Sequence, residues 1–194
     1  MKKYLLMQFL LMCSALAFGA DPAAYFNGVT PVKGYKSQTD HNPMMTQRFG
    51  ADPYAMVYND EVFVYMTNDV YEYDSNGKLT TNSYGKINKI NCISSKDLVN
   101  WTDHGSMDIA GRNNSAGAAK WATCSWAPSA MHAKVNGKDK FFLYFANNGS
   151  GIGVVTSDTP YGPWTDPIGK ELISRNTPNC GNVTWLFDPA VLMD

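Results

Sequence analysis

Short apolar runs separated by turn-forming residues dominate the chain beyond residue 48, whereas residues 21–48 are polar and show no sustained periodicity. The strand-like runs are 61–66, 87–93, 141–145 and 152–156. Asn59-Asp60 and Asn136-Gly137 lie between paired runs, where two-residue β-hairpin turns are expected. No stretch beyond the N-terminal 20 residues has the 3.6-residue period of an amphipathic helix. The pattern therefore predicts an all-β fold.

The chain also repeats itself. Trp101-Thr102-Asp103 recurs as Trp164-Thr165-Asp166, 63 positions later, and each copy follows a strand-like run. Prolines that open apolar runs recur at Pro53, Pro128 and Pro189, with spacings of 75 and 61 residues. A repeat of this length with about four strands predicts the blades of a β-propeller. A β-sandwich is the alternative, but it would not repeat its corner.

The composition narrows the class of ligand. Of the 194 residues, 44% are hydrophobic, 13% aromatic and only 17% charged, which is a globular profile. The net charge is −1 and no basic patch stands out, so nucleic acid is not an expected partner. Many aromatic and few charged residues favour a neutral, hydroxyl-rich ligand such as a sugar.

Residues 1–20 have the pattern of a secretory signal peptide. Lys2 and Lys3 precede an apolar stretch at 4–18, and small residues suited to cleavage follow. The stretch is short for a membrane span and no second one follows, so we expect no membrane association after cleavage. A lipoprotein signal around Cys13 is the weaker alternative, because the residues before it fit a lipobox poorly. We expect export to the periplasm or the medium.

Three cysteines remain in the expected mature chain, Cys92, Cys124 and Cys180. An odd count does not suggest a disulfide framework, and no spacing suggests a zinc site. One bridge among the three stays open at this stage, and we expect mostly buried thiols.

Two Asp-Pro pairs carry the candidate chemistry. Asp52-Pro53 precedes the apolar run 54–58, and Asp188-Pro189 precedes 190–193. Proline suits the first residue of a strand because it lacks a backbone N–H, and it pushes the preceding residue toward extended geometry. Each pair is therefore predicted to hold a carboxylate at the entrance of a buried strand. The alternative is a pair of ordinary Asp-Pro turns.

The predicted propeller gives these carboxylates a shared location. The innermost strand of each blade begins near the central funnel, which would bring Asp52, Trp126 and Asp188 to one pocket. Two carboxylates facing a sugar suggest acid–base cleavage of a glycosidic bond. The rims of Trp126 and Tyr54 could pack against sugar C–H surfaces and exclude water.

Taken together, these motifs resemble glycoside hydrolase family 43. The matching segments are Ala51-Asp52-Pro53, Trp126-Ala127-Pro128-Ser129, Phe187-Asp188-Pro189 and the Ser-Ser-Lys-Asp-Leu-Val-Asn-Trp stretch at 94–101, within residues 41–194. The resemblance implies a five-bladed β-propeller, of which about two blades and a fraction are present. It also implies an enzyme that removes arabinose or xylose from plant polysaccharides with inversion at the anomeric carbon.

The resemblance implies a role for each matching residue. Asp52 matches the general base, and Asp188 matches the residue that orients the general acid and raises its pKa. Trp126 and Phe187 match aromatic residues around the bound sugar, and Tyr54 is a further candidate substrate contact.

The general acid of the family is a glutamate that has no counterpart here. The candidates Glu61, Glu72 and Glu171 all lie outside the matching context. We therefore expect residues 21–194 to be the N-terminal part of a catalytic propeller domain, and we expect this part alone to be inactive.

The predicted function is that of an α-L-arabinofuranosidase acting on arabinoxylan. The alternatives are a β-xylosidase and a non-catalytic propeller that binds carbohydrate. The expected partner is a polysaccharide or oligosaccharide substrate. No cofactor is expected to be required, and a structural calcium ion is left open.

Overall fold

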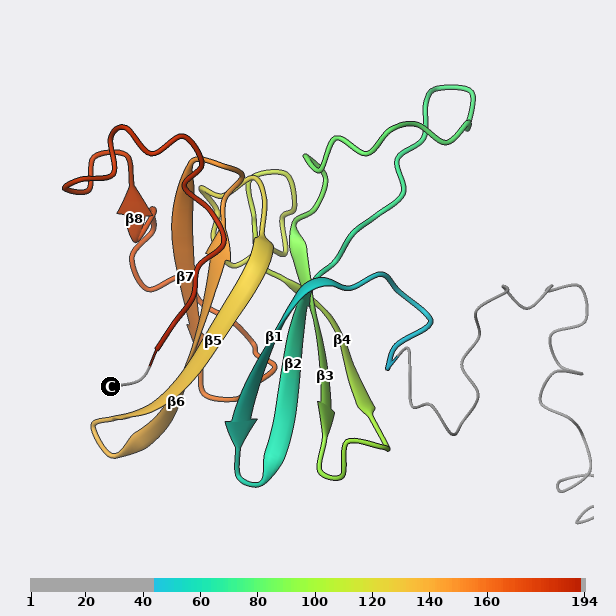
Figure 1. Cartoon of the computed structure of the whole chain (residues 1–194). Helices are drawn as coiled ribbons and strands as arrows, with labels where there is room; N and C mark the ends of the chain where they lie inside the picture. The colour runs from blue at the N-terminus through green and yellow to red at the C-terminus, as the bar shows by residue number, and fades with distance from the viewer. Residues whose placement is uncertain (1–43, 193–194) are drawn as a thin grey trace, which may run out of the picture. The chain divides into compact units, whose positions relative to one another are not determined.

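The computed structural model describes residues 44–192, which form two four-stranded antiparallel sheets (Figure 1). The strands of the first sheet, in both chain and spatial order, are β1 (Ala51–Tyr58), β2 (Glu61–Thr67), β3 (Lys89–Ser95) and β4 (Thr102–Asp108). Those of the second are β5 (Trp126–Val135), β6 (Lys138–Ala146), β7 (Gly151–Ser157) and β8 (Ile173–Ser174). Residues 44–192 contain no helix, and hence none that could cross a membrane. The predicted signal peptide, 1–20, and Cys13 lie outside the described residues.

The predicted hairpins are confirmed. Tyr58 pairs with Glu61 across Asn59-Asp60, and Val135 pairs with Lys138 across Asn136-Gly137. All four turn residues have positive φ, between 50° and 78°. Asn, Asp and Gly tolerate this left-handed geometry, and its twist matches the twist of the flanking strands.

The predicted repeat is confirmed at its corners. Thr102 pairs with Ser94 in the first sheet, and Thr165 pairs with Thr156 in the second. The fourth strands differ, because the first corner continues into β4 whereas the second forms a single bridge. Pro160, Pro163 and Pro167 flank this second corner, and a proline cannot donate to a strand ladder. The short β8 completes the edge of the second sheet instead.

The hydrophobic core lies between the two sheets. The first sheet contributes Phe63, Tyr65, Ile90 and Cys92, and the second contributes Phe141, Leu143, Phe145 and Val155. The Tyr65 hydroxyl crosses this interface and donates a hydrogen bond to the Pro160 carbonyl at 2.7 Å. Each sheet therefore buries its apolar face against its neighbour, as adjacent propeller blades do.

Two predicted strands differ from expectation. Of the residues in β1 only Met56 is fully buried, and Ala55 and Val57 are exposed, because one face of β1 packs on the second sheet and the other meets no described residue. The predicted strand at 190–193 is wrong for residues 190–192, which pair with no strand; Met193 lies outside the described residues.

The cysteines differ in accessibility. Cys92, Cys124 and Cys180 are all free, which settles the bridge left open by the sequence. Cys92 and Cys124 are buried, and burial raises the pKa of Cys124 and raises that of Cys92 to about 12. Cys180 is partly exposed.

We therefore expect iodoacetamide to label Cys180 well before Cys92 or Cys124 in the native protein, since the thiolate is the reactive form and must be reached by the reagent. Peptide mapping by mass spectrometry measures the labelling of each thiol. Labelling in denaturant is the control, and there all three should react at similar rates. Early native labelling of Cys92 would contradict the buried position of β3.

Candidate functional site

The residue before each repeated proline has left-handed backbone geometry. The φ angles are 50° at Asp52, 41° at Ala127 and 55° at Asp188. The extended geometry predicted for Asp52 and Asp188 is therefore wrong. Register shifts occur just here, between Ala51 and Tyr54 and between Trp126 and Ser129, so β1 and β5 each begin with a bulge. A bulge redirects the side chain that it carries, and positive φ at a non-glycine residue is a form of strain found at functional sites.

A threonine at the end of β2 holds the Asp52 carboxylate. The Thr67 hydroxyl donates to Asp52 Oδ2 at 3.0 Å and accepts a hydrogen bond from the Ala127 amide at 2.8 Å. Thr67 is only 2% exposed. The starts of β1 and β5, 75 residues apart in sequence, are thus joined through one buried hydroxyl.

The third Asp-Pro motif comes to the same place. Tyr54 Oη donates to the Val191 carbonyl at 3.2 Å, and the Val191 amide donates to Ser129 Oγ at 3.0 Å. These contacts fix the segment that carries Asp188 beside the starts of β1 and β5. The convergence of the three Pro-opened segments that the repeat predicted is therefore present.

Three carboxylates share this region and influence one another. Partial burial, and then the negative charge of Asp52, raise the pKa of Asp188. The same two causes, in the same order, raise the pKa of Asp69. Like charges at short range disfavour ionisation, so these shifts place Asp69 and Asp188 within electrostatic reach of Asp52.

Asp69 was missed by the sequence reasoning, which followed only carboxylates that precede proline. A usable signal was available, because Asp69 comes two residues after the end of β2. In an antiparallel hairpin the end of the second strand lies beside the start of the first. A carboxylate just after β2 was therefore bound to lie near Asp52.

Exposed aromatic rings surround this end of the second sheet. The Trp126 indole donates to the Tyr84 carbonyl at 3.1 Å, and the two rings meet edge to face. Phe187 is 38% exposed and lies 5.9 Å, centroid to centroid, from Trp185, which is 68% exposed and was not singled out from the sequence. The hydroxyl of Tyr54 is taken up by Val191. The roles of Trp126, Phe187 and Tyr54 toward a sugar stay predictions.

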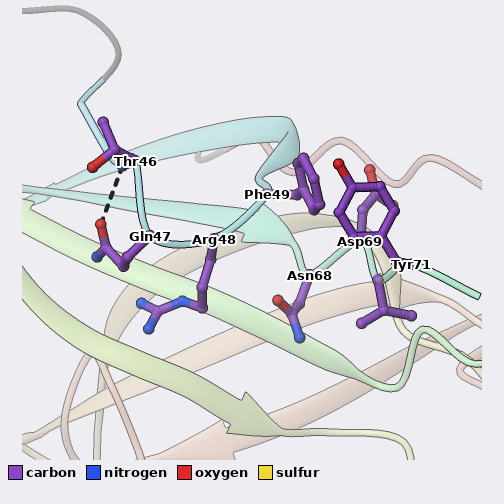
Figure 2. A pocket seen from close by; sticks show the side chains of 8 residues that line it. Thr46, Gln47, Arg48, Phe49, Asn68, Asp69 and Tyr71 are labelled. Atoms are coloured by element: carbon purple, nitrogen blue, oxygen red, sulfur yellow. Dashed lines mark hydrogen bonds between the residues drawn. The ribbon is translucent and has the colours of Figure 1, made fainter. Parts of the chain in front are cut away.

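An open pocket of about 460 Å³ lies beside the carboxylates, between residues 46–49 and the segment 68–71 that follows β2. Figure 2 shows the rings of Phe49 and Tyr71 facing each other across its end, with Asp69 next to them. Their centroids are 4.8 Å apart and the rings are perpendicular. The buried Asn91 side chain holds the two walls together by donating to the Phe49 carbonyl and to Asn68 Oδ1, at 2.7 and 3.1 Å.

Within residues 44–192, no group of three or more His, Cys, Asp or Glu side chains is arranged to hold a metal ion. The chemistry that these residues offer is that of carboxylates. Asp52 is oriented by a hydroxyl, Asp188 and Asp69 lie within its field, and aromatic rings stand beside them. Such a set suits proton transfer at a neutral, hydroxylated ligand.

Comparison with known proteins identifies this arrangement. The family model for glycosyl hydrolases family 43 matches residues 40–194. An arabinoxylan arabinofuranohydrolase from Paenibacillus polymyxa is 55% identical over 156 residues, which are 79% of this chain and 25% of that protein.

Two solved structures are also similar. One is a family 43 arabinoxylan arabinofuranohydrolase from Bacillus subtilis in complex with cellotetraose, with 57% identity and a TM-score of 0.75 over 79% of this chain and 32% of that one. The other is an α-L-arabinofuranosidase from Clostridium thermocellum, with 41% identity and a TM-score of 0.55 over 80% and 47%.

The chain spans between a quarter and a half of the length of these relatives. The match nevertheless covers most of the chain itself and includes all three proline-opened segments. The predicted fold class, an all-β five-bladed β-propeller represented by part of its blades, is confirmed by these neighbours and by the two sheets. The chain belongs to glycosyl hydrolases family 43.

Proposed function

We propose that the full-length gene product is an α-L-arabinofuranosidase that removes arabinose from arabinoxylan with inversion. The observation that carries this proposal is the convergence of Asp52 and Asp188, from segments 136 residues apart, on one end of the two sheets. The names of the relatives support arabinoxylan as the substrate, since two of them are arabinoxylan arabinofuranohydrolases at 55% and 57% identity.

In this proposal Asp52 is the general base. It removes a proton from water as the water attacks the anomeric carbon. The hydrogen bond from Thr67 engages Oδ2, which leaves Oδ1 for the water. Inverting glycosidases separate base and acid by roughly 6.5–9.5 Å so that this water fits between base and sugar.

Asp188 assists the general acid. The acid must carry a proton at the working pH, and a nearby negative charge keeps it protonated by raising its pKa. We propose that the acid is a glutamate supplied by the part of the relatives' length that this chain does not span. Residues 44–192 then contribute the base, the modulating carboxylate and one side of the sugar pocket.

The exposed rings give the pocket its preference for a sugar. Trp126 and Phe187 would pack against the C–H faces of the arabinosyl unit, where aromatic surface replaces water. The neighbouring pocket between Phe49 and Tyr71 would hold a further part of the polysaccharide, because it is open and joins aromatic faces to polar groups such as Asn68 and Asp69.

The test is to incubate the purified full-length protein with arabinoxylan and to identify the released sugar. We expect arabinose, and proton NMR during the first minutes should show the inverted anomer before mutarotation. Xylose from aryl β-xylosides in place of arabinose would establish the β-xylosidase alternative. Binding to arabinoxylan without release of either sugar would establish the non-catalytic one.

A further inference from the structure

Thr67 has a hydrogen-bonding arrangement that runs in one direction only. The Ala127 amide can only donate, so Thr67 Oγ1 is its acceptor, at 2.8 Å. The hydroxyl proton of Thr67 is then free for Asp52 Oδ2 at 3.0 Å, and an ionised carboxylate can only accept. The order amide, hydroxyl, carboxylate is therefore fixed, and each bond polarises the next.

This hydroxyl is the one buried contact that restrains an otherwise exposed carboxylate. Asp52 is exposed and its backbone is left-handed, whereas Thr67 is buried in β2. As a β-branched residue in a strand, Thr67 has few χ1 rotamers open to it. A hydroxyl fixed in this way sets the direction in which the carboxylate plane faces.

The second sheet provides an internal comparison. Thr67 pairs with Ala51 across the bulge that begins β1, and Ala146 pairs with Trp126 across the bulge that begins β5. The residue before proline is Asp52 in the first case and Ala127 in the second. The same bulge therefore forms with alanine at the position of Thr67 when no carboxylate has to be held. The hydroxyl serves Asp52 and is not needed to build the blade.

We propose that Thr67 is a positioning residue for the reaction: its side-chain hydroxyl, locked by the main chain of the next blade, holds Asp52 in the orientation needed to activate water. This inference rests on the proposed role of Asp52 as general base. It adds that the base is oriented by a contact between two blades, so that the angle between the blades sets the direction of proton abstraction.

The experiment compares three variants of the full-length protein. Thr67→Val keeps the shape and removes the hydroxyl, and Thr67→Ser keeps the hydroxyl. Thr156→Val is the matched control, because Thr156 is a buried threonine in β7 that hydrogen-bonds only to the repeated corner at Thr165. Thr67→Ala replaces the valine variant if that variant does not fold.

We expect Thr67→Val to lower kcat about 10- to 100-fold, the effect of losing a hydrogen bond to a charged group, with KM changed less than about threefold. Thr67→Ser should stay within about threefold of the parent, and so should Thr156→Val. A crystal structure of Thr67→Val should show the Asp52 carboxylate turned away from its parent orientation. This last measurement does not depend on activity.

The outcomes separate the two proposals. Failure of the parent protein to release a sugar counts against the proposed function alone, and the orientation of Asp52 in the Thr67→Val crystal structure still decides the positioning role. An active parent with full kcat in Thr67→Val, or an Asp52 carboxylate unmoved in that structure, would overturn the inference about Thr67. An equal loss of kcat in Thr67→Val and Thr67→Ser would also overturn it, since the loss would then come from packing.

Discussion

Replacing Asp52 with asparagine is expected to lower kcat on arabinoxylan by at least about 100-fold, because a positioned general base typically contributes 10²–10⁴ to the rate. Asparagine has the same shape and can still accept from the Thr67 hydroxyl, but it cannot take a proton from water. Since Asn tolerates left-handed φ as well as Asp does, the bulge at the start of β1 should persist. Initial rates of arabinose release by the full-length protein measure the effect.

The matched control for this change is Asp158→Asn. Asp158 is an exposed aspartate that follows β7, at the end of the second sheet away from Trp126, and it pairs only with Lys140. It should retain parental kcat, and both variants should melt within a few degrees of the parent. Turnover close to that of the parent in Asp52→Asn would remove Asp52 from the mechanism.

Replacing Asp188 with asparagine should move the alkaline limb of the kcat/KM profile to lower pH. The negative charge of Asp188 raises the pKa of the general acid by repulsion, so its removal lets the acid lose its proton earlier as the pH rises. The fraction of active enzyme at neutral pH then falls. The measurement is a pH–rate profile on a soluble aryl arabinofuranoside, with the Asp158→Asn variant run beside it.

The stability of Asp188→Asn carries a sign of its own. Burial and the charge of Asp52 raise the pKa of Asp188, which means that its ionised form is disfavoured in the folded protein. At neutral pH the ionised side chain therefore opposes folding, and its neutralisation should leave the melting temperature unchanged or slightly higher. A loss of activity with an unmoved alkaline limb would show that Asp188 positions groups or binds sugar without tuning the acid.

Sequence reasoning was accurate where local chemistry decides the structure. Asn59-Asp60 and Asn136-Gly137 can adopt left-handed φ at little cost, so the hairpins and their registers followed from the residues alone. The Trp-Thr-Asp corners repeated because each one turns the chain after a buried third strand.

It was wrong where a tertiary contact overrides a local preference. A residue before proline prefers extended geometry, yet Asp52 and Ala127 are left-handed because Thr67 binds the carboxylate of one and the amide of the other. The exposure of Ala55 and Val57 was equally beyond local reasoning, since burial depends on which sheet lies across from a strand. Asp69 escaped because the search followed a dipeptide motif when strand adjacency was the better guide.

The two hydrogen bonds that hold Val191 have a consequence for how the site is made. Their partners, Tyr54 and Ser129, both precede Val191 in the chain and are therefore synthesised first. On the ribosome, where N-terminal segments fold before later ones emerge, both sheets can form before the segment carrying Asp188 leaves the exit tunnel. The earlier blades then serve as a template onto which the later carboxylate docks. A defect in either sheet thus reaches the active centre as a misplaced Asp188, even in a chain whose Asp188 is intact.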